Sequence, residues 1–529
     1  MTLPRLSVAL FSETNLSNTN FSQTHRVGPL LPWRQRQAAV TPRIVHLGIG
    51  AFHRAHLAWY TDALMQAGGG DDPWPWAIMG VSLRSPEVAA QLNPQQGLYT
   101  LQQSSASSAS QQVIQSVLGV LVAPQDPATV ITLLGAPTTE IISLTVTEKG
   151  YCLDLVSRQL DFTHPDIVFD LAHPSTPRSA IGYLVAGLAE RFEKGYPAPT
   201  ILCCDNLPQN GVTLARLVTQ FAEKLNPELA GWITSQVAFP SSMVDRIVPA
   251  TTQADIEVLA AETGYMDLAM VKTEQFSQWV IEDKFAGVRP AWEQVGALLV
   301  QDVTPFEHAK LRLLNGAHSA LAYLGTLAGY SYVHQVVADP LFGRYLRHLM
   351  TQELMPTLLV DGQAPAGLDL PRYIDALLQR FANPALAHRT MQIAMDGSQK
   401  LPQRLLAAAQ QRLHAGQPVD AICFAVAGWL RFSMGFDAKG DALEVSDPLA
   451  ARLLEIRLVH WDHIDELVGE YLKLSQVFAP ALVAYPQFAA RLTYWLSYIL
   501  ANGVPTALQS LLLEVQDYAA APRLAGSAK

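Results

Sequence analysis

One stretch in the second half of the chain, residues 304–325, combines several reactive side chains with an apolar background (TPFEHAKLRLLNGAHSALAYLG). At the angular spacing of an α-helix, about 100° per residue, four of its polar side chains fall within one arc: Glu307, Lys310, Asn315 and His318. Arg312 points away from that arc. Because a lysine, an amide and an imidazole are costly inside a core, the arc fits the floor of a cleft.

The chemistry available to this set is proton transfer at a hydroxyl or carbonyl group. A lysine such as Lys310 serves as a general base when desolvation or a neighbouring cation lowers its pKa toward neutrality. Asn315 can donate a hydrogen bond to a developing alkoxide, and His318 can hold a hydroxyl. Gly316 costs helix stability unless another segment approaches closely there. Glu307 is explained equally well as the capping-box glutamate of a helix that begins with TPFE.

Two further groups of polar residues follow apolar runs that we predict as strands. The segment CCDNLPQNG carries Asp205, Asn206 and Asn210, and the segment FPSSMVDRIVP carries Asp245 and Arg246. In open α/β sheets, ligands bind beyond the carboxyl ends of the strands. These side chains are therefore candidates for a ligand site, although ordinary Asx turns explain both groups equally well.

A nucleotide site is indicated by the segment GIGAFHRAH, residues 48–56, which lies between an apolar run and a predicted helix. Gly48 and Gly50 can form the tight turn and let backbone N–H groups approach a pyrophosphate. His53 replaces the third glycine of the usual fingerprint, which implies a wider approach of helix and strand. A G-x-G pair alone is weak evidence, but its place at the start of an α/β region strengthens it. The candidate cofactor-binding residues of this turn are Gly48, Gly50, Ala51, Phe52 and His53.

The adenosine end of such a site should lie near the end of the second predicted strand. There the sequence WAIMGVSLRSPE offers Glu87 as its first carboxylate, and Arg84 leaves the preference between NAD and NADP open. An exposed glutamate at the start of a helix is the simpler explanation of Glu87. His53, Arg54 and His56 either add positive charge near the phosphates or are solvated residues of the first helical turn.

The elements that must position these residues change in type near residue 300. Five apolar runs are predicted strands: RIVHLGIG, WAIMGVSL, EIISLTVTE, PTILCCDN and SQVAFPSSMV. Helical patterns at 52–66, 178–194 and 210–225 alternate with them, which predicts a mostly parallel sheet with helices on both faces. After residue 300 the apolar runs have helical spacing, which predicts a mainly helical second half.

The chain is therefore expected to be an α/β protein with three parts. We expect an N-terminal arm, residues 1–40, a Rossmann-like dinucleotide-binding domain, 41–298, and a mainly helical substrate and catalytic domain, 299–529. The polar, low-complexity segment LQQSSASSASQQ, residues 101–112, is expected to be a loop or the tip of an inserted hairpin.

Composition limits the classes of partner. A formal net charge of −10 over 529 residues argues against nucleic acid as the main partner. No apolar run is long enough to span a membrane, and the N-terminus lacks the pattern of a signal peptide, so we expect a cytoplasmic protein. The four cysteines are expected to be buried, reduced thiols rather than metal ligands: Cys152, Cys203, Cys204 and Cys423.

Six segments, taken together and in order, resemble the polyol-specific long-chain dehydrogenases, also called the mannitol dehydrogenase family: GIGAFHRAH, SLTVTEKGY, CDNLPQNG, FPSSMVDRIVP, QWVIEDKF and KLRLLNGAHSALAYLG. The resemblance extends over residues 28–515, and the K-x-x-x-x-N-x-x-H spacing at 310–318 is highly specific to that family. It implies zinc-independent hydride transfer between NAD(H) and a secondary alcohol or ketone of a sugar derivative.

The same resemblance implies roles for individual residues. Lys310 would be the general acid/base, and Glu307 would connect it to solvent. Asn206 and Asn315 would form the oxyanion site. The residues that would orient the substrate are His318, Asp245 and Lys400. Helical residues of the second half would close a cleft over the nicotinamide, and no metal would take part.

Within the family, SLTVTEKGY and HRTMQIAMDGSQKLPQRLL most resemble the fructuronate reductase, or mannonate oxidoreductase, branch. The mannitol-oxidising branch carries an arginine eight residues before the lysine of its D-G-S-x-K segment, where this chain has Gln392. The segment instead offers Arg389 and Arg404 beside Lys400. A uronate carboxylate favours a cationic fork, so these three cations either bind substrate or face solvent.

Three functional hypotheses remain open at this point. The first is a fructuronate/mannonate oxidoreductase, and the second is a mannitol or arabinitol 2-dehydrogenase with the same chemistry. The third is a non-catalytic dinucleotide-binding protein, whose mark would be a broken Lys/Asn/His set, whereas the set here is complete. For the two enzymes, the partner is a small sugar acid or polyol. We expect a monomer or small homo-oligomer that binds neither nucleic acid nor membranes.

Overall fold

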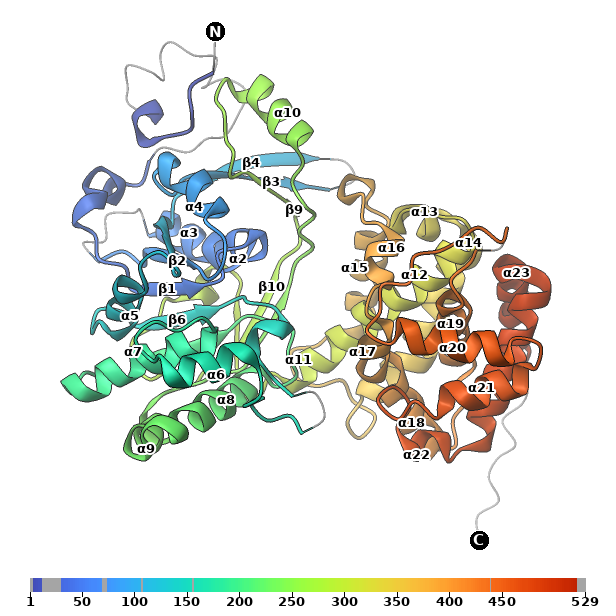
Figure 1. Cartoon of the computed structure of the whole chain (residues 1–529). Helices are drawn as coiled ribbons and strands as arrows, with labels where there is room; N and C mark the ends of the chain where they lie inside the picture. The colour runs from blue at the N-terminus through green and yellow to red at the C-terminus, as the bar shows by residue number, and fades with distance from the viewer. Residues whose placement is uncertain are drawn as a thin grey trace. The chain divides into compact units, whose positions relative to one another are not determined.

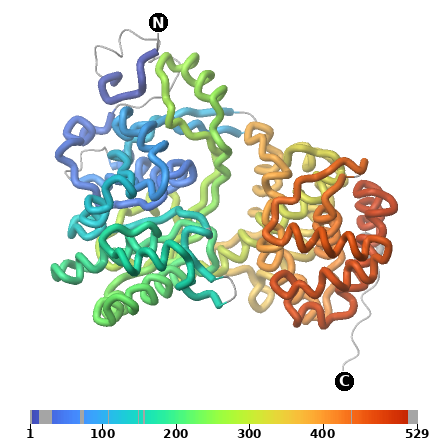
Figure 2. The backbone as a smooth tube through the Cα atoms, in the orientation of Figure 1, coloured from blue at the N-terminus to red at the C-terminus, as the bar shows by residue number. Residues whose placement is uncertain are grey.

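The computed structural model describes residues 3–11, 30–68, 74–105, 108–154, 157–437 and 439–520. It divides into two compact units, residues 1–304 and residues 305–529. Figures 1 and 2 trace the chain in colours that run from blue at the N-terminus to red at the C-terminus. Among the described residues, every named strand lies in the first unit, and the second unit is helical.

A five-stranded parallel sheet forms the centre of the first unit, with the strand order β5–β2–β1–β6–β7. Its strands are β1 (Ile44–Leu47), β2 (Ile78–Ser82), β5 (Val117–Val122), β6 (Ile141–Leu144) and β7 (Thr200–Cys203). Leu47 pairs with Val81 on one side and with Leu144 on the other, so these strands end at the same edge. The chain moves outward from β1 to β5 and then returns to the other side of β1. The crevice between the carboxyl ends of β1 and β6 is therefore the topological switch point.

Helices cover both faces of this sheet, which confirms the prediction from strand–helix alternation (Figure 1). The α-helices of the first unit are α2 (Ala51–Ala55), α3 (Leu57–Ala67), α4 (Glu87–Leu92), α5 (Pro127–Gly135), α6 (Pro165–Ala172), α7 (Ala180–Lys194), α8 (Asn210–Leu225), α9 (Pro227–Gln236) and α10 (Gln253–Thr263), of which α10 lies away from this sheet in Figure 1. Successive strand residues point to opposite faces. Ile44 thus shares a core with Tyr60 of α3, whereas Val45 shares one with Leu184 of α7. The helix predicted at 52–66 is interrupted at His56, where φ is −122° and ψ is −94°.

Two three-stranded sheets complete the first unit, with the orders β11–β10–β8 and β4–β3–β9. Their strands are β3 (Tyr99–Ser104), β4 (Ala109–Ile114), β8 (Ser242–Asp245), β9 (Val271–Glu274), β10 (Gln278–Glu282) and β11 (Leu298–Val300). β3 and β4 pair antiparallel, so the hairpin alternative for residues 101–112 is confirmed. Residues 106 and 107 lie outside the described residues.

The strand predicted at SQVAFPSSMV, residues 235–244, is confirmed only for its last three residues, which belong to β8, and β8 is not part of the parallel sheet. The first two residues of the segment end α9, and Ala238 forms only an isolated parallel bridge with Thr200. From Ser242 onward the chain pairs antiparallel with β10 in a separate sheet. Pro240 has no N–H group to donate to a ladder, which gives the physical reason for the break.

The described N-terminal residues pack onto the first unit. They form two short 3-10 helices, η1 (Val8–Phe11) and η3 (Pro32–Ala39). Trp33 is fully buried. Arg34 donates to the carbonyl oxygens of Gln96, at 2.9 Å, and Val117, at 2.6 Å. Residues 1, 2 and 12–29 of the predicted arm lie outside the described residues. Other 3-10 helices of this unit are η4 (Asn93–Gln95), η5 (Glu148–Tyr151) and η6 (Trp292–Val295).

The second unit is built of helices, as predicted for the second half of the chain. Its α-helices are α11 (Thr304–Ala309), α12 (Ala317–Leu327), α13 (Val333–Ala338), α14 (Pro340–His348), α15 (Leu370–Phe381), α16 (Thr390–Ala394), α17 (Gly397–Leu401), α18 (Ala407–His414), α19 (Asp420–Ser433), α20 (Ala450–His460), α21 (Ile464–Leu472), α22 (Pro480–Val483) and α23 (Pro486–Ala520). Its π-helical segments are η7 (Lys310–Gly316), η8 (Leu349–Leu354) and η11 (Pro402–Leu406), and its 3-10 helices are η9 (Met355–Leu358) and η10 (Pro384–Leu386). All of α12 is buried, so this helix forms the middle of the core.

One helix of the described residues, 486–515 within α23, is long and apolar enough to cross a membrane by length and composition alone. This finding corrects the expectation that no run reaches that length, because an average over the helix tolerates scattered polar residues. Trp495, Leu496 and Leu508 of this helix are buried in the same core as α19.

Candidate active site

The reactive stretch at residues 304–325 is a helix whose middle is wound differently from an α-helix. α11 ends at Ala309, η7 is π-helical from Lys310 to Gly316, and α12 follows. A π-turn closes hydrogen bonds between residues five apart, so each residue advances by a smaller angle than in an α-helix. The single α-helix assumed from the sequence is therefore wrong. Short π-helical segments within α-helices are frequent at functional sites.

A second π-helical segment, η11, explains why residue 316 is glycine. A Cβ atom at Gly316 would lie 2.9 Å from the carbonyl oxygen of Arg404 and 3.3 Å from Cδ2 of Leu405. The backbone of η11 therefore approaches η7 more closely than a side chain would allow. The close approach expected from the sequence is confirmed, and its partner is the segment that carries Arg404.

Two side chains of the predicted set are buried. Lys310 and His318 are each 7% exposed. The other two members, Glu307 and Asn315, are half-buried. Burying an ammonium group or an imidazole costs free energy unless other polar groups or a ligand compensate for the lost water. Their burial is therefore typical of a binding site rather than of a solvated helix face.

The imidazole of His318 is enclosed by rings and lies near cations. Its ring centroid is 4.4 Å from that of Phe381 and 5.6 Å from that of His388. Burial, followed by the charges of His388, Arg380 and Arg404, holds the pKa of His318 well below its usual value. Within the described residues, Nε2 of His318 is buried and has no hydrogen-bond partner. A neutral imidazole with an unpaired ring nitrogen can bind a hydroxyl group.

The three cations proposed for substrate binding differ in their surroundings. Arg404, in η11, is half-buried and donates to the carbonyl oxygen of Asn315 at 3.4 Å and to Oγ of Ser319 at 3.1 Å. Lys400, in α17, donates to the carbonyl oxygen of Met395 at 2.6 Å. Arg389 and Gln392 are both exposed on the segment around α16. Arg404 therefore contacts residues close to His318 in the helix, whereas Arg389 is exposed.

Two residues next to His318 were missed from the sequence, Arg380 and His388. Arg380 is only 8% exposed, in α15. Its spacing gave a usable signal, because Leu377, Arg380 and Phe381 share the buried stripe of an amphipathic helix. An arginine on such a stripe needs a partner for its charge. His388 gave no comparable signal, because it lies in a loop and reaches His318 only through the fold.

The predicted nucleotide turn lies at the switch point of the parallel sheet. Gly48 has a φ of +93°, and a Cβ atom there would lie 2.1 Å from the carbonyl oxygen of Thr145, in the loop after β6. Only glycine fits this position. Gly50 is exposed, and the nearest atom to a Cβ at this position would be the carbonyl oxygen of Gly48, at 4.0 Å. This open turn, followed by the N-terminus of α2, fits the pyrophosphate of a dinucleotide.

The basic residues of the same segment are buried rather than solvated. His53 and His56 are fully buried, and Arg54 is 6% exposed. The ring of His53 stacks on that of His46 with 3.4 Å between centroids. Burial, with the nearby His46 and Arg54, lowers the pKa of His53 well below its usual value. Both alternatives stated from the sequence are corrected for His53, because the first turn of α2 packs into the unit instead of facing solvent.

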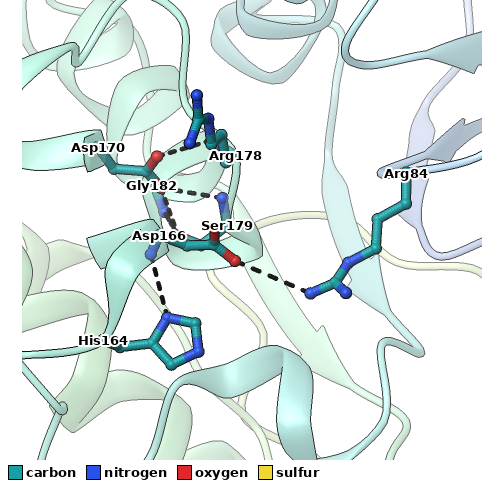
Figure 3. Close-up of polar contacts among 7 residues, drawn as sticks. All are labelled: Arg84, His164, Asp166, Asp170, Arg178, Ser179 and Gly182. Carbon is teal, nitrogen blue, oxygen red and sulfur yellow. Dashed lines mark hydrogen bonds and ion pairs between the residues drawn. The ribbon is translucent and has the colours of Figure 1, made fainter. Parts of the chain in front are cut away.

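The adenosine end of the predicted site carries an exposed ion pair (Figure 3). Glu87 is exposed at the first turn of α4, which is its simpler explanation. Arg84 follows β2, and its side chain is 80% exposed and lies 3.9 Å from Oδ2 of Asp166 in α6. The backbone N–H of Asp166 donates to Nδ1 of His164, which caps α6. The position expected to bind the adenosine ribose therefore carries an arginine and the carboxylate that faces it.

The turn after β7 holds structural and candidate catalytic residues side by side. Asn206 is exposed. Asn210 is buried and donates from Nδ2 to the carbonyl oxygens of Cys203, Asp205 and Ser242, at 3.2, 3.1 and 2.7 Å. Asn210 thereby ties β7 to β8, so the structural explanation holds for this residue. The carboxylate of Asp205 bonds to the loop after β6.

The segment after β8 is buried. Asp245 is 4% exposed and Arg246 is 5% exposed. Arg246 donates to the carbonyl oxygen of Glu274 at 3.1 Å and stacks over the ring of Trp59, with 4.7 Å to its centroid. Arg246 therefore has a packing role. Asp245 keeps its predicted role of substrate orientation as a hypothesis.

All four cysteines are free and buried, as predicted from their apolar settings. Burial, with the charge of Asp205, raises the pKa of the Cys203 thiol to about 12. A thiol in this state is a packing group rather than a nucleophile. Across the described ranges, no three His, Cys, Asp or Glu side chains gather as metal ligands do.

Two family models match almost the whole of this chain. Residues 42–294 match the mannitol dehydrogenase Rossmann domain, and residues 302–500 match the mannitol dehydrogenase C-terminal domain. The first match lies within the first compact unit, and the second begins at residue 302, close to the boundary between the units at residues 304 and 305.

Characterised relatives cover nearly the same span. D-mannonate oxidoreductase of Escherichia coli is 44% identical over 457 residues, which is 85% of this chain and 92% of that protein. Mannitol 2-dehydrogenase of Aspergillus fumigatus is 39% identical over 93% of this chain and 98% of its own length. The solved ternary complex of Pseudomonas fluorescens mannitol 2-dehydrogenase with NAD and D-mannitol has a TM-score of 0.80 and 38% identity, and covers 90% of this chain and 95% of that one.

Proposed function

The chain belongs to the mannitol dehydrogenase family of NAD-binding oxidoreductases, and from that premise we propose that it interconverts D-fructuronate and D-mannonate. Bound NAD(H) supplies or accepts the hydride. The chain then has to bind the sugar acid, move one proton and stabilise the charge that develops on the reacting oxygen.

The buried set in the second unit is suited to the proton transfer. Lys310 takes the proton from the alcohol during oxidation and returns it during reduction. Glu307, half-buried on the preceding turn, passes that proton to solvent. Asn315 and Asn206 donate hydrogen bonds to the developing alkoxide, and His318 binds a neighbouring hydroxyl through its unpaired Nε2. Asp245 and Lys400 orient the remainder of the substrate.

The observation that carries the choice of a sugar acid is the position of Arg404. Its guanidinium donates to the carbonyl oxygen of Asn315, three residues before His318, and to the hydroxyl of Ser319, the residue after it. A guanidinium held in place binds a carboxylate through charge-assisted hydrogen bonds, each contributing roughly 1.5–3 kcal/mol. The buried charge of Arg380 acts on the same imidazole. A neutral polyol can accept a hydrogen bond from the guanidinium, but it lacks the ionic attraction of a carboxylate.

A substrate panel tests the proposal directly. Oxidation of NADH should be followed with fructuronate, fructose and other 2-keto sugars, and reduction of NAD⁺ with mannonate and mannitol. We expect kcat/KM for fructuronate to exceed that for fructose by at least about tenfold, since one charge-assisted bond is worth that factor. Equal kcat/KM values for fructose and fructuronate would show that the enzyme does not recognise the carboxylate.

A mannitol or arabinitol 2-dehydrogenase is the second candidate. It is favoured by the structural likeness to the mannitol 2-dehydrogenase complex, with a TM-score of 0.80. Under this alternative, Arg404 has a purely structural role in joining η11 to η7. Preferred turnover of fructose, mannitol or arabinitol in the panel would establish it.

The remaining properties are proposed from composition and sequence likeness. We propose a cytoplasmic enzyme, a monomer or small homo-oligomer, that binds neither nucleic acid nor membranes, consistent with its net charge of −10. Catalysis is proposed to be metal-independent, so turnover should persist after exhaustive chelation. Loss of activity on chelation and recovery with zinc would contradict that proposal.

A further inference from the structure

The loop after β6, residues 145–151, is held by one carboxylate. Oδ2 of Asp205 accepts hydrogen bonds from the N–H of Val146 at 2.7 Å and from the hydroxyl of Tyr151 at 2.6 Å. Oδ1 of Asp205 accepts a bond from the N–H of Thr147 at 3.3 Å. Asp205 thus bonds to both ends of the loop from the turn after β7. Hydrogen bonds to a carboxylate are about twice as strong as those between neutral groups.

The same loop forms one wall of the crevice between β1 and β6. The hydroxyl of Thr145 lies 2.7 Å from the carbonyl oxygen of Gly48 and 2.8 Å from Nε2 of His46. A Cβ atom on Gly48 would collide with the carbonyl oxygen of Thr145. The nucleotide turn and the loop therefore touch at the switch point, where open α/β sheets bind their ligands.

One residue of the loop has a backbone shape that ordinary side chains avoid. Thr147 has a φ of +65° and a ψ of 162°, a region that only glycine occupies without strain. Its side chain is exposed, so burial of the threonine does not compensate for that strain. The bonds that Asp205 accepts from Thr147 and its neighbours provide the compensation. Strained residues held in this way cluster at ligand sites.

We propose that Asp205 is a positioning residue for catalysis. Its carboxylate holds the loop at 145–151 in the strained shape that forms the cofactor wall of the crevice. The adjacent Asn206 is held on the same turn, so loop and oxyanion donor are set by one group. The part concerning Asn206 rests on the proposed function, whereas the loop itself is defined by the contacts above.

The test is a double-mutant cycle between Asp205 and Thr147. Asp205→Asn replaces one acceptor oxygen with a donor, so the amide cannot accept all three bonds, and the loop should relax to an unstrained shape. We expect kcat to fall by at least about tenfold. Glycine adopts the backbone shape of Thr147 without steric strain. In a Thr147→Gly background, Asp205→Asn should therefore reduce kcat by a factor at least about threefold smaller than it does in the wild type.

A control separates positioning from general stability. Asp161 also accepts bonds from a backbone N–H and a hydroxyl, both of Thr163, at 2.8 and 2.6 Å. Asp161→Asn should leave kcat within about twofold of wild type, as expected of a substitution outside the functional loops. Thermal unfolding of each variant is measured alongside. Equal losses from Asp205→Asn in the two backgrounds, or no loss in either, would overturn the proposal.

Tyr151→Phe covers the case in which Asp205→Asn does not fold. It removes one of the three bonds and leaves the carboxylate, so a smaller loss of kcat is expected, again reduced by Thr147→Gly. If Tyr151→Phe lowers kcat by about tenfold or more, and by the same factor in the Thr147→Gly background, the proposal is contradicted. All of these ratios are taken on whichever sugar the wild type turns over fastest. If fructuronate is not the preferred substrate, the double-mutant cycle can still be measured with the preferred sugar, so the two proposals can fail independently.

Discussion

The guanidinium of Arg404 donates a hydrogen bond to the hydroxyl of Ser319 at 3.1 Å. The charge of Arg404 also acts on the buried imidazole of His318, the residue before Ser319 in α12, and lowers the pKa of that imidazole. Among the described residues, Nε2 of that imidazole has no hydrogen-bond partner. A fixed positive charge beside an unpaired ring nitrogen is suited to a ligand that carries both a carboxylate and a hydroxyl group.

Substrate charge is tested by Arg404→Gln. We expect this variant to lower the ratio of kcat/KM for fructuronate to that for fructose by about tenfold or more. The change should come mainly from a lower kcat/KM for fructuronate, because one charge-assisted bond to its carboxylate is lost. Arg389→Gln should lower the ratio less, since Arg389 is exposed. Steady-state kinetics on both sugars measure the two ratios. An unchanged ratio in Arg404→Gln would assign this arginine to structure alone.

Proton transfer is tested by Lys310→Ala. Turnover should fall by about a hundredfold or more, the range for a positioned acid–base group. NADH binding should persist, because the predicted nucleotide turn belongs to the first unit, whereas Lys310 belongs to the second. Rapid-quench turnover and a fluorescence titration with NADH separate the two effects. Near-normal turnover would remove Lys310 from the mechanism.

Cofactor choice is tested at the ion pair between Arg84 and Asp166. An arginine after the second strand is where a 2′-phosphate of NADP would bind. There we expect the carboxylate of Asp166 to compete for Arg84 and to repel the phosphate, an effect of about 1 kcal/mol. Asp166→Asn should therefore raise the ratio of kcat/KM with NADP to that with NAD by about fivefold. The double variant with Arg84→Gln should lose that gain. A ratio that stays constant in Asp166→Asn would show that the pair does not take part in cofactor choice.

Stability should depend on pH through Glu353, a buried carboxyl that accepts bonds from the N–H groups of Ala421 and Ile422, both at 2.8 Å. Burial raises the pKa of Glu353 to about 7. The folded protein thus holds this proton more tightly than the unfolded chain does. The stability it contributes is complete below the unfolded pKa of about 4.3 and is lost as the pH rises through about 7.

The measurement is the free energy of unfolding from chemical denaturation between pH 5 and pH 8. The wild type should lose up to about 3 kcal/mol over this range through Glu353, at 1.36 kcal/mol per unit of pKa difference. Glu353→Gln cannot ionise, so its free energy of unfolding should fall less. Parallel curves for the two proteins would show that Glu353 does not titrate in this range.

The local sequence determined the parallel sheet, the nucleotide turn and the helical second half. Strand–helix alternation and the G-x-G turn are patterns of neighbouring residues, so they can be recognised from the order of residues without knowledge of tertiary contacts. Gly316 was predicted to permit a close approach, because the cost of a mid-helix glycine is visible without knowing its partner. The partner, Arg404, was not predicted as such, because a contact over 88 residues depends on packing.

Tertiary structure decided the features that depend on two distant segments. The π-helical winding from Lys310 to Gly316 departs from the α-helical spacing that the residue pattern predicts. The burial of His53 against His46 depends on how α2 packs on the sheet. The antiparallel pairing of Ser242 with β10, and the strain at Thr147, were likewise settled by partners far along the chain. Local propensities are worth tenths of a kcal/mol per residue, whereas burying a side chain or satisfying a buried carboxylate is worth one to several kcal/mol, so packing prevails where the two disagree.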